Sequence, residues 1–472
     1  MRYLDNVKYL LNNFIFSSYR EEFKYTATHG TEFLISKDNF YISDLLKYES
    51  YHITNTDKKY HNLEFIKLLK SIGNCNYMDF DNAILQDKPI ILQMELHPGD
   101  HGFDEMIKYY FRKLFLDKRV LNGMVSGKIK LILYFGFEAD SFSSNEFHSI
   151  GTHTNYYQMF DTVFSEYSLP KNSIIILSSN SLGDVQEAEY YKNKNIKLGT
   201  IFANMYERNT FVHTKGDINF DYTFDEHLEN INNSKNRVVR VSRTQHYTRD
   251  VMLYYLYKSK NEYDTIIEQN KFYDDILFLK KLDKAKEISN KLGYDIGRYF
   301  NYTPSDISKL KSKLPYIASE YEKINPFDKN AIYSNETIPH DIYYNSICSW
   351  VSTSIPDRST QVFLNSSTFN PMLYYHPLIF HGNPNTKKEL NRWGYKSYDF
   401  FTNTDDLDYM DDDIERLVHS INTIDRIYNT SKNQLIQMIA DSRDVLEYNR
   451  NLLFECKSIE HTLTKLYDLL NE

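Results

Sequence analysis

The stretch that decides the fold class is residues 363–401, "FLNSSTFNPMLYYHPLIFHGNPNTKKELNRWGYKSYDFF". Its polar run at 366–368 can cap a helix that tolerates Pro371 in an early turn, because the first amide groups of a helix have no partner within it. The apolar run at 378–380 predicts a short buried strand halted by the next Gly and Pro, and 386–393 predicts a small helix. This order is typical of one edge of a parallel sheet, where ligands bind at the carboxyl ends of the strands.

The length and composition of the chain set bounds on the fold. At 472 residues the chain is too long for one common domain, so we expect two large lobes with extensions. Hydrophobic residues make up 41% and aromatic residues 15% of the chain, which excludes a disordered protein and indicates a globular one. The net charge of −9 disfavours indiscriminate binding to nucleic acid, although a local basic groove is compatible with that total.

Cysteine usage and hydropathy bear on the compartment. Cys75, Cys348 and Cys456 lie far apart and form no CxxC pair, so the sequence predicts neither a disulfide framework nor a zinc ribbon, and a reducing compartment fits best. No apolar run approaches the roughly 18 residues of a membrane span, and the first residues do not resemble a signal peptide. The abundance of Tyr, Asn, Lys and Ile indicates AT-rich coding, which is common in viral genomes. We therefore expect a soluble cytoplasmic protein, located in the host cytoplasm if it is viral.

Alternating strand and helix patterns predict a first lobe at 80–215. Four apolar runs predict its strands, at 89–96, 129–137, 173–180 and 197–204. Helices are predicted between them at 103–117 and 155–168, so the sheet is expected to be mostly parallel. Residues 1–80 are expected to form an N-terminal extension, and 215–236 has the Asn- and Asp-rich composition of a linker.

A second lobe is predicted at 237–430. It begins with a strand at 237–242, a turn and a helix, and "SICSWVST" and "HPLIFHG" predict further strands. The chain from 411 is predicted to be helical, because apolar residues recur there at helical spacing. The last helices, at 431–472, have an apolar face and are expected to pack back across the lobes. The predicted architecture is α/β, with two parallel-sheet lobes facing a central cleft.

Two segments carry a resemblance to a known family. "NRVVRVSRTQHYTRDVMLYYL", residues 236–256, resembles the strand, arginine-bearing loop and Leu-rich helix of a family of phage and large-virus glycosyltransferases of GT-B-like fold. Residues 349–401 resemble the same family's later segment, which has the form T-E-K-T-F-K-P, then P-F-I-I-F-G-N-P-G, then L-K-x-L-G-F-K-T-F. The positions that agree there are Thr368, Phe369, Pro371, Pro377, Gly382, Asn383, Pro384, Leu390, Gly394, Tyr395 and Lys396. "EYNRNLLFE", residues 447–455, resembles the family's terminal helix.

The resemblance implies two Rossmann-like lobes and the transfer of a sugar from a nucleotide-diphosphate sugar to a hydroxyl group. A UDP-sugar is the first candidate for the donor. The acceptor would be a viral glycan or a hydroxymethylated pyrimidine in DNA, as some phage enzymes of this fold use. The chain departs from the family where Ser366 and Ser367 replace an acidic and a basic residue and where Asn370 replaces a lysine. Because a carboxylate there typically holds the donor ribose, the alternative is a catalytically weakened GT-B-like protein that binds a nucleotide or a glycan.

The donor-binding residues are expected at the second lobe's strand ends. A departing diphosphate develops negative charge, which cations and helix amide groups would meet. A guanidinium fork suits phosphate oxygens, and two arginines with a histidine between them are expected in the loop after the first strand of this lobe. The amino end of the helix at 366–368 would cradle the diphosphate, and the turn at 381–383 would line the nucleotide side. The candidate donor-binding residues are Arg243, Arg249, His246, Ser366, Ser367, Thr368, His381, Gly382 and Asn383.

An inverting transfer also needs a base for the acceptor hydroxyl, placed in the first lobe. Asp100, with His97 beside it, follows the first predicted strand, and Glu138, with Asp140, follows the second as the rival base. "HPGDH" is typical of a capped loop, and the acidic run at 411–413 is typical of a solvated helix start, so no metal site is predicted and no metal cofactor is expected. A basic face that would suit a DNA acceptor could form from Lys108, Arg112, Lys113, Lys118 and Arg119. The acidic total charge instead favours a glycan, and both acceptors stay open.

Overall fold

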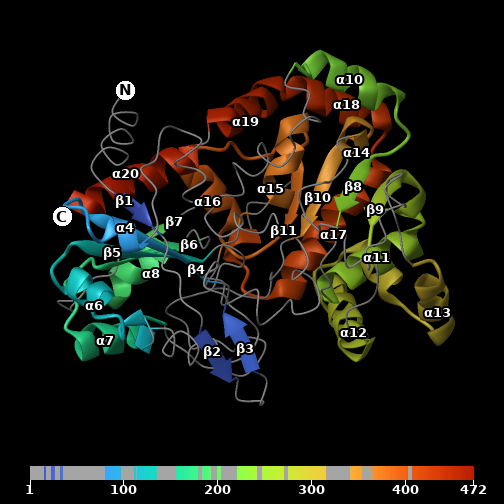
Figure 1. Ribbon diagram of the computed structural model, residues 1–472. Helices are drawn as coiled ribbons and strands as arrows, with labels where there is room; N and C mark the ends of the chain where they lie inside the picture. The colour runs from blue at the N-terminus through green and yellow to red at the C-terminus, as the bar shows by residue number, and fades with distance from the viewer. Residues whose placement is uncertain are drawn as a thin grey trace. The chain divides into compact units, whose positions relative to one another are not determined.

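The computed structural model describes separate parts of the first half of the chain and most of the second half, and every structural statement below refers to these residues (Figure 1). The described residues are 15–17, 23–26, 32–35, 80–96, 111–112, 114–135, 156–178, 183–192, 199–202, 221–241, 247–269, 275–314, 341–352, 362, 364, 366–401, 407–455 and 457–471.

The chain divides into two compact units. One comprises residues 1–205 together with 458–472, and the other comprises residues 206–457. Each unit contains a sheet of parallel strands, so the α/β class expected from the sequence is confirmed. None of the helices in the described ranges combines the length and the apolar character that crossing a membrane requires.

The first unit contains a five-stranded sheet in the order β1-β4-β5-β6-β7, in which all neighbouring strands are parallel. Its strands are β1 (Ile15–Ser17), β4 (Ile90–Leu96), β5 (Ile129–Phe135), β6 (Ile174–Ser178) and β7 (Gly199–Phe202). Strands β4 to β7 confirm the four predicted strands. Strand β1 comes from the stretch expected to be an extension, so that stretch contributes to the sheet. An antiparallel hairpin of β2 (Phe23–Thr26) and β3 (Glu32–Ile35) belongs to the same unit.

Helices from both ends of the chain belong to the first unit. They are α4 (Phe80–Ala83), α6 (Lys118–Val125), α7 (Tyr156–Tyr167), α8 (Gly183–Tyr190) and α20 (Lys457–Asn471). Helix α7 confirms the helix predicted at 155–168. The Lys130 ammonium on β5 donates to the carbonyl oxygens of Leu469, at 2.9 Å, and Leu470, at 3.4 Å. This contact holds the last turn of α20 against the sheet. The positive charge of Lys130 also interacts favourably with the negative end of the α20 helix dipole.

The second unit contains a four-stranded parallel sheet in the order β11-β10-β8-β9. Its strands are β8 (Val238–Val241), β9 (Thr265–Glu268), β10 (Cys348–Ser352) and β11 (Leu378–His381). The chain passes from β8 to β9 on one side and then returns to the other side of β8 to form β10 and β11. The sheet therefore has a topological switch point between β8 and β10, which is where open parallel sheets bind ligands.

Two long helices pack beside each other in the second unit. Helix α11 (Tyr247–Ser259) is buried on every side from Tyr247 to Leu256, which explains why its sequence has no polar face. It lies along α17 (Asp413–Asn429), and the Trp350 indole on β10 donates to the Ser420 hydroxyl on α17 at 2.6 Å. The other helices are α10 (Phe224–Asn233), η2 (Asn261–Asp264), α12 (Asp275–Lys291), η3 (Asp295–Phe300), α13 (Pro304–Ser312), α14 (Asp341–Tyr344), α15 (Ser366–Phe369), η5 (Asn370–Tyr374), α16 (Thr386–Arg392), η6 (Leu407–Tyr409), α18 (Lys432–Asp441) and α19 (Arg443–Glu455).

The decisive stretch folds largely as its sequence indicates. Strand β11 and helix α16 confirm the predicted strand and helix, and Gly394 ends α16 in the left-handed region at φ 91°. The linker predicted at 215–236 is wrong, because α10 lies there. A capping box of Thr223 and Glu226 starts α10 and its apolar side is buried, so the Asn- and Asp-rich composition belongs to a helix with one exposed face.

Candidate functional site

The switch point of the second sheet is bridged by Arg249. This residue lies in the first turn of α11, whereas the sequence suggested the preceding loop. Its guanidinium Nη2 donates to the carbonyl oxygen of Ser352, the last residue of β10, at 2.9 Å. Arg249 is only 4% exposed. The side chain thus crosses from the helix that follows β8 to the carboxyl end of β10.

Arg249 belongs to a closed ring of contacts, which we call the carboxyl-edge ring: Tyr247, Arg249, Ser352, His381 and Asp413. The Ser352 hydroxyl lies 3.4 Å from His381 Nδ1, and His381 Nε2 lies 3.1 Å from the carbonyl oxygen of Asp413. The Tyr247 hydroxyl donates to Asp413 Oδ2 at 2.8 Å, which returns the ring to α11. Four elements, α11, β10, β11 and α17, are therefore held together at the carboxyl end of the sheet.

The tautomer of His381 follows from its partners. A carbonyl oxygen only accepts, so Nε2 must carry the proton that it donates to Asp413. In the neutral ring Nδ1 then accepts from the Ser352 hydroxyl. His381 is completely buried, which fits a positioning role between β10 and α17 better than proton exchange with solvent.

A second arginine lies beneath the ring. Arg240, the penultimate residue of β8, donates from Nη2 to the carbonyl oxygen of Arg249 at 2.8 Å and to Gln269 Oε1 at 2.9 Å. Gln269 in turn donates to Asp250 Oδ1 at 2.7 Å. Within the described part of the chain, Arg240 Nε and Nη1 have no hydrogen-bond partner although the side chain is 1% exposed. Burial, with the nearby Arg249, lowers the pKa of Arg240 to about 9, so the group still carries its charge at neutral pH.

Asp413 has a cationic partner as well. The Lys281 ammonium on α12 lies 3.3 Å from Asp413 Oδ2 and 4.3 Å from the centre of the Tyr247 ring. Burial alone favours the neutral acid, but Lys281 and the Tyr247 hydroxyl hold the pKa of Asp413 below its usual value. These two clusters contain three cations, Arg240, Arg249 and Lys281, and two carboxylates, Asp250 and Asp413. The charges of these five side chains therefore sum to a net positive charge.

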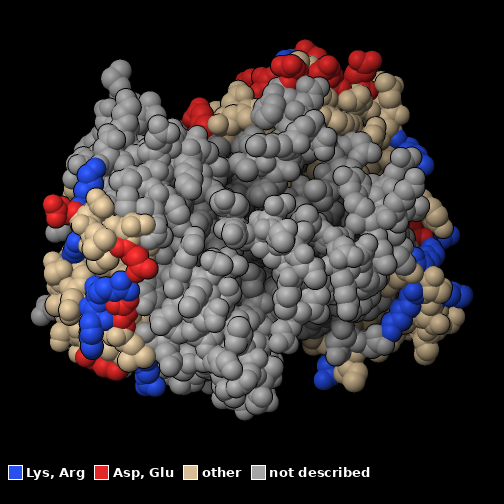
Figure 2. Space-filling model, in the orientation of Figure 1, with Lys and Arg blue, Asp and Glu red and all other residues tan. Residues whose placement is uncertain are grey.

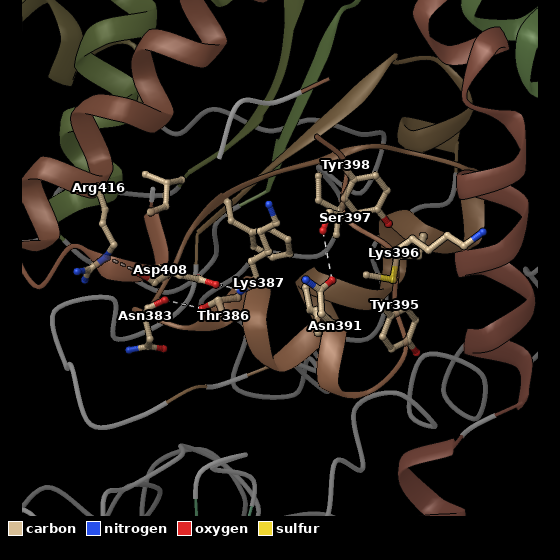
Figure 3. Close-up of a pocket in the computed structure, with 16 residues that line it drawn as sticks. Asn383, Thr386, Lys387, Asn391, Tyr395, Lys396, Ser397, Tyr398, Asp408 and Arg416 are labelled. Atoms are coloured by element: carbon tan, nitrogen blue, oxygen red, sulfur yellow. Dashed lines mark hydrogen bonds between the residues drawn. The ribbon is translucent and has the colours of Figure 1, made fainter. Parts of the chain in front are cut away.

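A pocket lies on the outer side of β11, beneath α16 (Figure 3). It has a volume of about 580 Å³, which includes space open to solvent at its mouth. Apolar side chains form much of its lining, and amide, hydroxyl and charged groups complete it. The lining residues are Met372, Leu378, Phe380, Gly382, Asn383, Thr386, Lys387, Leu390, Asn391, Tyr395, Lys396, Ser397, Tyr398, Leu407, Asp408 and Arg416.

Asp408 occupies the amino end of α16 in this pocket. Its carboxylate accepts from the backbone N–H of Lys387 at 3.1 Å and of Lys388 at 2.7 Å. Asn385, at the cap position, has φ 65° and makes no side-chain cap, so Asp408 supplies the cap from another segment. Burial raises the pKa of Asp408, and the two N–H donors only partly oppose this. The amino end of α16 therefore already has an anion of the protein itself.

The turn after β11 is held from α17. Arg416 Nε donates to the carbonyl oxygen of Gly382 at 3.0 Å, and the Thr386 hydroxyl donates to that of Asn383 at 2.6 Å (Figure 3). Both Gly382 and Asn383 are buried and line the pocket, while His381 belongs to the carboxyl-edge ring. The three turn residues proposed from the sequence thus divide between the ring and the pocket.

The polar run at 366–368 forms the start of a short helix. Helix α15 has four residues and continues into η5, so the chain does not form the longer apolar helix that the capping residues suggested. Thr368 is completely buried, and among the described residues its hydroxyl has no hydrogen-bond partner, so it does not cap a helix. Ser366 and Ser367 are described by their backbone alone.

Several predicted residues lie outside the described residues. These are Arg243 and His246 of the donor site, the base candidates Asp100, Glu138 and His97, and also His101, Asp140, Lys108 and Lys113. They stay predictions.

The predicted basic face is partly neutralised in the first unit. The Arg119 guanidinium pairs with Asp81 at 2.8 Å and with Asp117 at 2.7 Å, and these carboxylates offset its charge. Arg112 and Lys118 are exposed. In the described ranges, no three His, Cys, Asp or Glu side chains are placed to hold a metal ion. Asp412 caps α17, as expected of a helix start, but Asp413 is buried and not solvated.

Sequence reasoning missed Arg240, Tyr247, Lys281 and Asp413 as parts of the site. A signal for Arg240 was available, because a charged residue in the apolar strand "VVRV" of a parallel sheet is unusual where both faces are covered. The ring contacts leave no comparable signal, since Tyr247 and Asp413 lie 166 residues apart in the chain. No protein-family model, no curated protein and no solved structure matches this chain.

Proposed function

We propose that the second unit binds the diphosphate of a nucleotide sugar at the switch point and that the protein is a glycosyltransferase. The observation that carries the proposal is the buried pair of guanidinium groups, Arg240 and Arg249, at the carboxyl end of a parallel sheet. Buried guanidinium groups interact strongly with an anion, because the low dielectric of the interior strengthens the attraction. A diphosphate would supply that anion, and its charge would grow as the sugar departs.

The proposal for the acceptor side of the reaction is based on the sequence. A base in the first unit, Asp100 or Glu138 with His97 beside the former, would take the proton of the acceptor hydroxyl. The acceptor would be a glycan or a hydroxymethylated pyrimidine in DNA. The neutralised Arg119 removes one cation from the face that a DNA backbone would use, which favours the glycan.

A second candidate function is binding of a nucleotide or a glycan without transfer. Ser366 favours it, because the resembling family has a carboxylate at that position to hold the donor ribose. Donor-dependent release of free nucleotide diphosphate separates the two functions. If ribose recognition is what the chain lacks, Ser366→Glu should tighten donor binding.

The test of the site compares three arginine variants by calorimetric titration with UDP, UDP-sugars and inorganic pyrophosphate. Arg249→Met should lose about 2–3 kcal/mol of binding free energy, the range for hydrogen bonds to charged groups. Arg240→Met should lose a similar amount and should also lower the free energy of unfolding, because the Arg249 carbonyl oxygen and Gln269 lose their buried donor.

Arg237→Met is the matched control. Arg237 directly precedes β8 and donates to the carbonyl oxygens of Ile427, Tyr428 and Thr430 at the carboxyl end of α17. Its loss should therefore lower the free energy of unfolding and leave ligand affinity intact. Equal affinity of folded Arg249→Met and wild-type protein for every ligand would exclude the site.

A further inference from the structure

Two tyrosine–aspartate hydrogen bonds join α11 to α17. Tyr247 donates to Asp413 at 2.8 Å in the first turns of both helices, and Tyr255 donates to Asp425 at 2.9 Å near their other ends. All four residues are buried. The tyrosines are eight residues apart, about 12 Å along the helix axis. The pairs are chemically alike, but only Tyr247–Asp413 belongs to the carboxyl-edge ring.

The surroundings of the first pair differ from those of the second in a way that points to function. Arg249 lies in the same helical turn as Tyr247, and its guanidinium is directed to the carbonyl oxygen of Ser352. Asp413 also accepts from His381 through its backbone and faces Lys281 through its carboxylate. The Tyr255 hydroxyl instead accepts from Asn261 at 3.2 Å, and the Asn261 carbonyl oxygen accepts from Thr265 at the amino end of β9.

We propose that Tyr247 and Asp413 are a positioning pair, which holds the first turn of α11 where Arg249 can meet an anion at the switch point. The identity of the anion rests on the proposed function, whereas the placement of the helical turn does not. Binding an anion with a preorganised guanidinium avoids the cost of ordering that side chain. The Tyr255–Asp425 pair contributes to stability alone.

The experiment compares Tyr247→Phe with Tyr255→Phe in the full chain. Each variant keeps the aromatic side chain and removes one hydroxyl group, so both should lose a similar free energy of unfolding in urea. Hydrogen exchange followed by mass spectrometry should show faster exchange in the first turn of α11 for Tyr247→Phe alone. Titration with inorganic pyrophosphate should show about tenfold weaker binding for Tyr247→Phe and a change of less than about twofold for Tyr255→Phe.

Variants of Asp413 test the pair from the other side. Asp413→Asn keeps an oxygen that can accept from Tyr247 but loses the ion pair with Lys281, so its exchange in the first turn of α11 should stay closer to that of wild-type protein than the exchange of Asp413→Ala, which should behave as Tyr247→Phe does. The same exchange in the first turn for Tyr247→Phe and Tyr255→Phe would overturn the inference. Failure of wild-type protein to bind pyrophosphate and UDP would instead count against the proposed function, and the exchange data would still decide the role of the pair.

Discussion

At the scale of single residues, burial lowers the pKa of two basic groups of the second unit, but it leaves one charged and the other neutral at pH 7. It lowers the pKa of Arg240 to about 9, and the side chain remains charged at neutral pH. It lowers the pKa of His376 to about 4, and the ring is neutral at the same pH. His376 makes two good contacts, at 2.8 Å with the Ser349 hydroxyl and at 2.7 Å with the Tyr343 carbonyl oxygen. A retained charge indicates a binding role, whereas a satisfied neutral histidine indicates a structural one.

His376 should make the stability of the second unit depend on pH. Its pKa is 6.5 in an unfolded chain and about 4 in the fold, so between these values the unfolded state binds more protons. The contribution is complete above about pH 6.5 and is lost as the pH falls towards 4, by about 3 kcal/mol. Burial also lowers the pKa of the neighbouring His227, which adds to the loss in the same direction.

Urea unfolding at a series of pH values between about 7 and 4.5 measures this dependence. His376→Gln should reduce the slope, because the replacement does not titrate. The partly buried His419, which contacts the Tyr294 hydroxyl at 2.9 Å, provides His419→Gln as a comparison. An undiminished slope in His376→Gln would show that other groups cause the loss.

At the scale of elements, the sequence was informative where burial follows a local pattern. Strands β4 to β7, β8, β10 and β11 and helices α7, α16 and α17 follow the sequence pattern, because apolar runs and helical spacing record which side is buried, whereas β1 and β9 are not predicted by it. Helix α10 has the composition of a linker because its exposed side is polar, and its helical signal is the capping box of Thr223 and Glu226. Arg249 and His381 are indicated by the sequence because they lie near the carboxyl ends of predicted strands, where the ligand-binding edge of the sheet must lie. Their ring depends on pairing between distant segments, which no local pattern records.

Asp408 gives an element-scale prediction, since it caps α16 from outside the helix. Asp408→Ala should destabilise the second unit by about 1 kcal/mol and increase exchange at the amides of Lys387 and Lys388, because their acceptor is lost. Asp408→Asn retains an acceptor oxygen and should cost less. Asp399→Asn is the control, since Asp399 contacts the Lys387 ammonium at an exposed position and should contribute little. Equal stability of Asp408→Ala and Asp399→Asn would argue against the cap.

At the scale of the whole molecule, net charge is a poor guide to the site. The chain carries −9 overall, and on the face in Figure 2 acidic side chains gather over α10 and α18 of the second unit. The buried arginines lie at the carboxyl end of the sheet in the same unit. Charge that is exposed is screened within about 10 Å by salt, whereas buried charge is screened much less. The acidic total is therefore compatible with a cationic site for a diphosphate.

The two-unit division predicts the effect of removing α20. Deleting residues 457–472 takes the buried Leu463, Leu466, Leu469 and Leu470 away from the first unit, together with the acceptors of Lys130. Four leucines represent roughly 6–12 kcal/mol of burial, which is comparable to the whole stability of a domain, so the first unit should unfold. The second unit ends at Lys457, so the deletion removes only that residue from it. It should keep its urea transition and its pyrophosphate affinity within about twofold. Hydrogen exchange resolves the two units in one experiment, and protection of β4 to β7 that survives the deletion would contradict the assignment of α20 to the first unit.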